Sequence, residues 1–169
     1  MRVVRSPHPR ATFALGDLGA IVAATQGLEA ILTHEDVPGE NSFGIFPHTR
    51  DQPVFAEGHV RFRGEAVIGL VGTKEAVESL SDADLPITWT VEAPVTGVGE
   101  ARAKGAHAVH AGKPDNFLAG GRLKCGDVEA ARPTAAVVSE GRFETAYVEH
   151  AYIEPEAGFA VPVGDRMEV

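Results

Sequence analysis

The stretch "VEHAYIEPEAG", late in the sequence, gathers the side chains best suited to proton transfer: His150, Tyr152, Glu154 and Glu156. On a strand, His150, Tyr152 and Glu154 would share one face, because strand side chains alternate with a period of two. A histidine and a glutamate so placed could act as general acid and base, or line a polar pocket. Polar groups inside a fold are usually satisfied hydrogen-bonding groups, so the residues alone favour a polar pair that fixes strand packing.

Two other candidates lie in the glycine- and alanine-rich segment between them and the first half of the chain. His107 and His110 form an HxxH pair, which on a helix could present two ligands to one metal. The segment has few helix signals and no third ligand nearby, so we expect no metal site. Cys125 has the basic neighbours Arg122 and Lys124, yet a nucleophilic thiolate also needs a histidine base, and an inert surface thiol is favoured.

A fourth candidate is the loop "PHTRDQP", which clusters His48, Arg50 and Asp51. An arginine–aspartate pair with a neighbouring histidine could bind an anion. A loop of this length also needs hydrogen bonds to be ordered, and this pinning role is favoured. The glycine-rich stretches "GVGEA" and "AGGRLKCGD" match no dinucleotide or phosphate-loop spacing, and we read them as turns.

Composition limits the possible partners. The chain has 169 residues, 44% of them hydrophobic, and 15 basic against 24 acidic residues give a net charge of −9. This balance disfavours nucleic acid and anionic membranes as partners. A single cysteine allows no internal disulfide, and neither a signal peptide nor a membrane-spanning run is recognisable, so we expect a cytoplasmic protein.

The first half of the sequence predicts an α+β domain. "RVVRSP" and "LEAILT" are typical of strands, and "LGDLGAIVAAT" between them predicts a helix capped by Asp17. "HVRF" and "EAVIGLVG" predict paired strands that turn at Gly64, the second buried on both faces. "TKEAVESLS" predicts a helix capped by Thr73, and "LPITWTVEAP" predicts a further strand. Residues 39–52 form an irregular loop that carries Phe43 and Phe46.

The second half is less regular. From about Ala93 the periodicity fades into a long connection, and residues 136–169 are strand-like again. "FAVPVGDRMEV" predicts a hairpin that turns at Gly164 and Asp165. If nothing covers this hairpin, its open edges could pair with a second copy and form a homo-oligomer.

These segments resemble, in order, the molybdopterin-binding large subunit of the molybdenum hydroxylases, the xanthine dehydrogenase and aldehyde oxidase family. The similar stretches are "VVRSPHPRA", "TQGLEAILTHEDVPG", "DQPVFAEGHVRFRGEAVIGLVGTKEAV", "VHAGKPDNFL", "CGDVEAA" and "EHAYIEPEAGFA". Departures from the family pattern, such as Arg63 and Ala66, suggest a divergent subgroup.

The resemblance implies an "α/β hammerhead" domain in residues 1–100, a connecting segment in 101–135 and the truncated start of the molybdopterin-binding domain in 136–169. The family's catalytic and pterin-contacting segments lie further along than Val169, so no catalytic residue is assigned in this chain. His150 and Glu154 match the family's motif and would stand behind the groups that touch the cofactor.

The resemblance further implies an enzyme that oxidises an aldehyde or aromatic heterocycle with water-derived oxygen at a molybdenum–pterin cofactor. Electrons would pass to iron–sulfur clusters and FAD on partner subunits or domains. The chain alone should bind no cofactor and be inactive without the remainder of the molybdenum-binding domain. The alternative is a stand-alone hammerhead module for protein binding or assembly.

Overall fold

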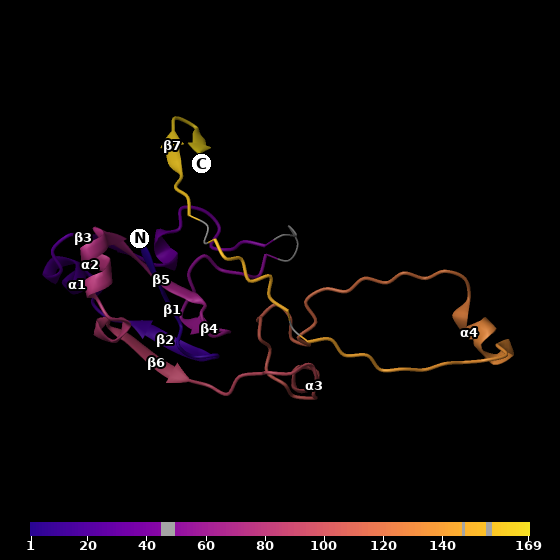
Figure 1. Ribbon diagram of the computed structural model, residues 1–169. Helices are drawn as coiled ribbons and strands as arrows, with labels where there is room; N and C mark the ends of the chain where they lie inside the picture. Colours follow the sequence, from indigo (N-terminus) through magenta and orange to yellow (C-terminus); the bar gives the residue numbers. More distant parts are fainter. Residues whose placement is uncertain (45–49, 147, 155–156) are drawn as a thin grey trace. The chain divides into compact units, whose positions relative to one another are not determined.

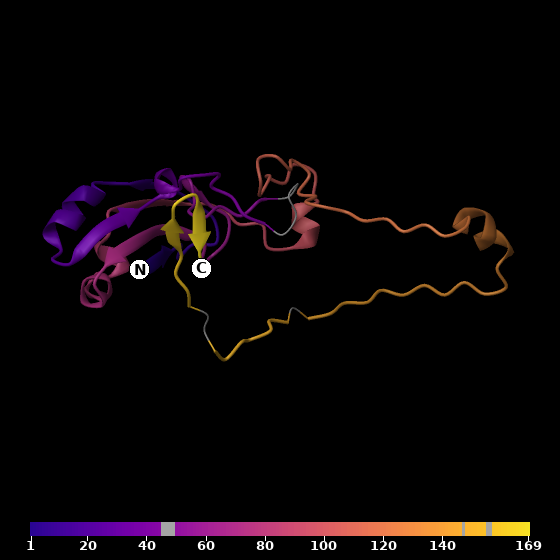
Figure 2. The same ribbon diagram turned by 90° about the horizontal axis from the view of Figure 1, so that it is seen from above.

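The computed structural model describes residues 1–44, 50–146, 148–154 and 157–169. The chain forms two units, Met1–Arg122 and Leu123–Val169. The buried hydrophobic core lies entirely in the first unit, between Val4 and Leu85. Strands β1 to β6 and helices α1 and α2 gather around this core (Figure 1, Figure 2).

The first sheet has the predicted buried strand at its centre. β5 (Ala66–Gly72) pairs antiparallel with β1 (Arg2–Arg5) on one side and β3 (Leu28–Leu32) on the other. Val67, Ile68 and Leu70 of β5 are fully buried. The continuous apolar run thus forms a strand covered on both faces, as the sequence predicted.

In the second sheet, the predicted hairpin around Gly64 is wrong. β4 (His59–Val60) pairs with β2 (Ala11–Leu15), which in turn pairs with β6 (Ile87–Val91); β4 does not pair with β5. Gly64 takes the predicted positive φ of 95°. The backbone N–H of Arg61, however, donates to the Glu65 side chain, so residues 61–65 close on themselves as a turn and extend no ladder. β2 was not predicted.

Short capped helices flank the strands. α1 (Leu18–Ala24) begins after Asp17, whose carboxylate accepts from the N–H of Ala20, and α2 (Lys74–Ser79) begins after Thr73, which caps it in the same way. Both predicted caps are confirmed. The 3-10 helices η1 (His34–Asp36) and η2 (Asp82–Asp84) each carry a capping box.

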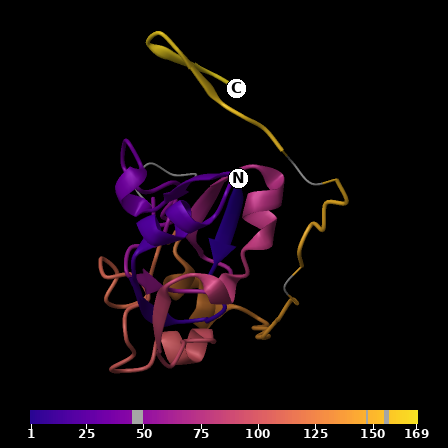
Figure 3. The ribbon, with the colours of Figure 1, turned by 90° about the vertical axis from the view of Figure 1, so that its left-hand side faces the viewer.

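The N-terminal strand is fastened to the region after α2. The Arg2 guanidinium donates to the Leu80 carbonyl at 2.8 Å and to the Asp82 carboxylate at 2.6 Å. Figure 3 shows β1, in indigo, beside the magenta helix α2. The chain's beginning is therefore part of the first unit's packing and not a loose end.

The remainder of the first unit is mainly loop. α3 (Val98–Ala101) is a single turn, and the following loop closes on Asn116. The Asn116 amide oxygen accepts from the N–H of Val109, and its NH₂ donates to the carbonyls of Ala101 and His107. Asn116 itself has a φ of 56°, a left-handed conformation that asparagine tolerates better than most residues.

The second unit has little regular structure. It contains α4 (Val128–Ala131), η3 (Arg132–Thr134) and the hairpin of β7 (Val161–Val163) with β8 (Arg166–Glu168). The hairpin turns at Gly164, with a φ of 63°, as predicted. The strands expected between residues 136 and 160 are absent from the described part of that range. Figure 1 shows extended chain on both sides of α4, and a strand forms only where a partner strand takes its hydrogen bonds.

In the ranges that the structure covers, no helix has the length and apolar character needed to cross a membrane.

Candidate functional site

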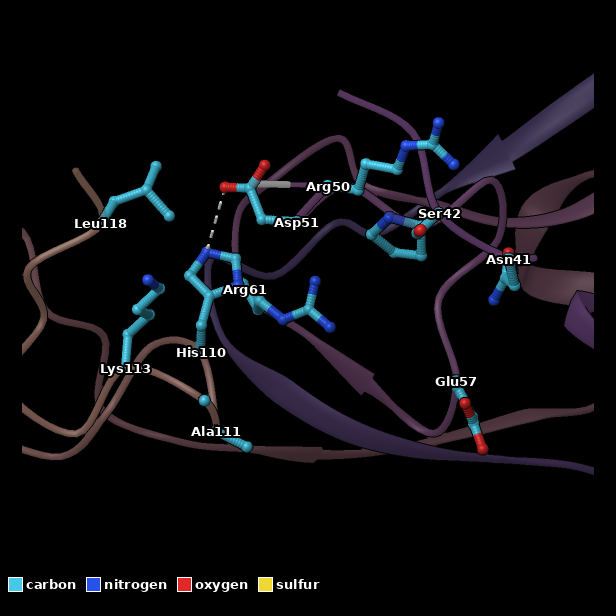
Figure 4. Close-up of a pocket in the computed structure, with 12 residues that line it drawn as sticks. Asn41, Ser42, Arg50, Asp51, Glu57, Arg61, His110, Ala111, Lys113 and Leu118 are labelled. Carbon is cyan, nitrogen blue, oxygen red and sulfur yellow. Dashed lines mark ion pairs between the residues drawn. The ribbon is translucent and has the colours of Figure 1, made fainter. Parts of the chain in front are cut away.

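The candidate site is a cavity of about 380 Å³ in the first unit. Its walls come from Asn41 and Ser42, from residues 50–61, and from the turn at residues 110–118 (Figure 4). Three kinds of side chain line it: cations, carboxylates and a few neutral groups. The cations are Arg50, Arg61 and Lys113, joined by His110, and the carboxylates are Asp51 and Glu57.

Asn41 shapes one wall. Its amide oxygen accepts from the N–H groups of Val54 and Phe55 at 3.0 and 3.2 Å, and its NH₂ donates to the Phe55 carbonyl at 2.8 Å. All of these bonds go to backbone groups, so the residues before and after the loop are held together at its base.

Asp51 and His110 meet across the cavity. The Oδ2 of Asp51 lies 3.8 Å from the Nε2 of His110, an ion pair whenever the imidazole is protonated (Figure 4). Arg50 does not pair with Asp51; its guanidinium contacts the exposed Glu40 at 3.2 Å. His48, the third residue of the predicted cluster, lies outside the described residues. Among the described residues, Asp51 thus links the end of the loop to His110, and the pinning role of the whole cluster remains a prediction.

Arg61 is positioned by a buried carboxylate that the sequence analysis missed. Glu65 is only 2% exposed, and it accepts from the backbone N–H of Arg61 at 2.5 Å and from its guanidinium at 3.2 Å. A buried acid is costly unless a cation and hydrogen bonds compensate it. A glutamate directly before an apolar strand, and shortly after two arginines, was the available signal in "RFRGEAVIGL".

The two histidines of the HxxH motif do not act together. His110 faces Asp51, whereas the Nε2 of His107 is shielded from solvent without a hydrogen-bond partner in the described structure. No group of three or more histidine, cysteine, aspartate or glutamate side chains within the described ranges could hold a metal ion.

The residues of "VEHAYIEPEAG" lie in the second unit, exposed where the structure describes them. The rings of His150 and Tyr152 stack with centroids 5.8 Å apart and an interplanar angle of 3°. Ala151 between them has a φ of 51°, so this is not an extended strand. Glu154 is exposed, and Glu156 lies outside the described residues. Cys125 is also exposed. The predicted roles of His150 and Glu154 remain predictions.

Comparison with known proteins identifies relatives for nearly the whole chain. Residues 109–169 match the family model of the molybdopterin cofactor-binding domain. The chain is 30% identical, over 165 residues, to a probable xanthine dehydrogenase subunit of Bacillus subtilis, covering 97% of this chain and 21% of that protein. It is 31% identical, over 157 residues, to the nicotinate dehydrogenase large molybdopterin subunit of Eubacterium barkeri, covering 92% of this chain and 36% of that protein.

A solved structure shares the fold. The aldehyde oxidoreductase from Desulfovibrio gigas superposes with a TM-score of 0.52 at 21% identity, over 67% of this chain and 13% of that one. The chain thus spans 21% and 36% of the length of the two curated relatives. Mixed strands and helices arranged in small antiparallel sheets agree with the predicted α+β class.

The residues that match the cofactor-binding model do not by themselves form a cradle for a pterin. From residue 119 onward every described residue is exposed. The one cavity described in the second unit is lined mainly by apolar residues around α4, whereas a pterin and its phosphate need several polar donors. On sequence and fold together, the chain belongs to the molybdenum hydroxylases, the family of xanthine dehydrogenases and aldehyde oxidases.

Proposed function

We propose that the chain is part of the molybdopterin-binding subunit of a molybdenum hydroxylase that oxidises an aldehyde or an aromatic heterocycle. The oxygen atom inserted into the substrate comes from water, at a molybdenum–pterin cofactor. The observation that carries this proposal is that two molybdenum-enzyme subunits align across 97% and 92% of the chain. We further propose that electrons leave through iron–sulfur clusters and FAD on partner subunits or domains.

We also propose the domain division given by the resemblance. Residues 1–100 are the α/β hammerhead domain, 101–135 the connecting segment and 136–169 the start of the molybdopterin-binding domain. In support of the first boundary, every residue of the core and of the hydrophobic groups packed against it lies between Val4 and Trp89. The family match begins at residue 109, inside the connecting segment.

The second unit supports the proposal that this chain acts only together with the remainder of the molybdenum-binding domain. Its apolar side chains are exposed where a folded domain would bury them: Phe143 is 93% exposed, Ile153 96% and Phe159 80%. Large apolar side chains that are almost fully exposed over a whole segment agree with a segment that further protein covers. We therefore expect the purified 169-residue chain to contain no stoichiometric molybdenum and to show no hydroxylase activity.

The experiment uses the intact subunit in complex with its partners. Molybdenum is quantified by mass spectrometry, and a panel of aldehydes and N-heterocycles, including xanthine and nicotinate, is oxidised in H₂¹⁸O. We expect one molybdenum per subunit and ¹⁸O in the product of at least one substrate. A complex that holds iron and flavin but lacks molybdenum, or a product with unlabelled new oxygen, would disprove the proposal.

The self-contained core of the first unit supports a second candidate, a stand-alone hammerhead module for protein binding or assembly. Such a module would cover the edges of the β7–β8 hairpin with its own residues, whereas a piece of a larger domain would leave these edges open to pair with a second copy. Sedimentation of the purified chain distinguishes a part of a larger subunit from a stand-alone module. A concentration-dependent dimer supports pairing through these edges, and a monomer at high concentration argues against it.

A further inference from the structure

We propose that the cavity lined by Asn41, Ser42, residues 50–61 and residues 110–118 binds a small organic monocarboxylate through Arg50 and Arg61. The proposal is independent of the molybdenum chemistry, because every residue that lines the cavity lies in the first unit and can be tested without cofactor.

The first argument is charge. The whole chain carries a net charge of −9, yet the cavity gathers Arg50, Arg61 and Lys113 against Asp51 and Glu57. Asp51 faces His110 at 3.8 Å, so one of the two carboxylates already has a cationic or hydrogen-bonding partner. Arg50 and Arg61 also contact Glu40 and Glu65, so the cavity carries no net positive charge; what favours an anionic ligand is the gathering of two guanidinium groups and an ammonium group in one place.

The second argument is the direction of the arginines. In Figure 4 the side chains of Arg50 and Arg61 extend to the side of Asn41 and Ser42, whereas Lys113 lies on the other side of the Asp51–His110 pair. Two guanidinium groups that border one space can present paired N–H donors to a carboxylate, the geometry in which arginine binds this group best.

Both arginines retain donors for a ligand. Arg61 gives only one nitrogen, NH1, to Glu65, and a guanidinium carries five N–H groups in all. The partner of Arg50 is Glu40, whose side chain is 68% exposed, and such surface pairs are weak and readily exchanged. Glu65 fixes the orientation of Arg61, while Arg50 is free to turn toward a ligand.

The third argument is an unsatisfied hydroxyl. The Oγ of Ser42 is shielded from solvent and has no hydrogen-bond partner in the part of the chain that the structure describes. A buried polar group left unpaired destabilises the free protein. Ser42 lines the cavity on the side of the arginines, and its hydroxyl must turn out of its shielded position before it can donate to a carboxylate oxygen seated there.

Size and remaining charge define the class of ligand. A cavity of about 380 Å³ suits a small molecule, and the side chains of Pro53 and Leu118 offer apolar contact to its body. Glu57, which also lines the cavity, opposes a second negative charge. The site therefore favours a monocarboxylate with an aromatic or aliphatic body over a phosphate dianion.

The test is calorimetric titration of the 169-residue chain with benzoate. Benzamide, which has the same shape without the charge, and inorganic phosphate are the comparison ligands. We expect benzoate to bind with one site per chain, and at least about 10-fold more tightly than benzamide, because charge-assisted hydrogen bonds are lost with the charge. Equal binding of benzoate and benzamide would overturn the proposal, as would phosphate bound more tightly than benzoate.

Variants locate the site. Arg50→Gln should weaken benzoate binding about 10-fold or more, whereas Arg63→Gln, which removes the same charge from an exposed position outside the cavity lining, should change it less than about twofold. Ser42→Ala should weaken binding yet leave the ligand-free protein at least as stable, since it removes an unpaired hydroxyl. Equal effects of Arg50→Gln and Arg63→Gln would show that benzoate does not bind in this cavity.

Discussion

The buried carboxylate of Glu65 gives the sharpest test of how the first unit is held together. Glu65 ties the turn before β5 to Arg61, through the backbone N–H at 2.5 Å and the guanidinium at 3.2 Å. Glu65→Gln keeps the shape of the side chain, but replaces one acceptor oxygen with an NH₂ group and removes the charge. The perturbation therefore isolates the charge-assisted contacts from packing.

The expected loss follows from burial. The Glu65 side chain is 3% exposed and that of Arg61 is 24% exposed, so water replaces little of what the substitution removes. Loss of a hydrogen bond to a charged group costs about 1.5–3 kcal/mol, and we expect a decrease of about 2 kcal/mol in the free energy of unfolding. Glu65→Ala should cost about 3–5 kcal/mol, because it strands the cation completely.

Glu40→Gln is a matched control. Glu40 also accepts from an arginine, Arg50, at the same 3.2 Å, but its side chain is 68% exposed. Pairs in this setting contribute about 0.2–1 kcal/mol. Trp89, the single tryptophan, lies in β6 of the first unit, so its fluorescence during urea unfolding reports on this unit. If Glu65→Gln and Glu40→Gln lowered the free energy of unfolding equally, burial would not govern these pairs and the reasoning would fail.

Three further changes can be read by the same urea unfolding measurement. Leu70→Ala, at a fully buried position of β5, should lower the free energy of unfolding by about 2–5 kcal/mol through the cavity it leaves, and a loss below about 1 kcal/mol would mean that β5 is not central to the core. Gly72→Ala should cost about 1–3 kcal/mol, because its Cβ would clash with the Gly27 carbonyl oxygen where the chain enters β3 beside β5; a neutral result would contradict that close approach. Burial lowers the pKa of His59 in the folded chain below 6.5 and outweighs the opposing effect of Glu92. As the pH drops below 6.5, the imidazole is therefore protonated more readily in the unfolded chain than in the folded one, and the free energy of unfolding decreases. His59→Gln should flatten that decline, and an unchanged pH dependence would exclude His59 as its source.

Sequence patterns predicted the elements whose signals are local. The caps at Asp17 and Thr73, the apolar run of β5 and the glycine turn at Gly164 are all confirmed. Each depends on chemistry within a few residues: a side-chain oxygen over free N–H groups, a continuous apolar stretch, or a positive φ.

The pairing of strands could not be predicted from the sequence in the same way. β4 has only two residues, His59 and Val60, and it joins β2 because Val60 and Ala11 are both completely buried where the two strands meet. That choice depends on segments about 48 residues apart, and the register Ala11↔Val60 leaves no trace in either segment alone. Likewise, the pattern of residues 136–160 is strand-like, but a pattern cannot supply the partner that a strand requires.

In the candidate site, too, the sequence indicated individual residues but not their contacts. Arg50 and Asp51 stood out because three ionisable residues fell close together, and both line the cavity. Their partners could not be assigned from the sequence: Glu40 lies in the same irregular loop as Arg50, and His110, which stood out only as a possible metal ligand, faces Asp51 from a distant segment. Polar residues in loops have no periodicity from which contacts could be inferred, so only the folded chain reveals which charges meet.

Two asparagines, Asn41 in the lining and Asn116 close to it in sequence, explain how loops can form a defined cavity. Asn41 uses its whole amide on the backbone of Val54 and Phe55, and Asn116 does the same for the segment that ends at His110. Each amide substitutes for the ladder hydrogen bonds that these irregular segments lack. Because the backbone is fixed before any ligand arrives, little ordering entropy opposes binding, and affinity should depend on the charges of Arg50 and Arg61 themselves. This is why neutralising Arg50 is a test of recognition and not of folding.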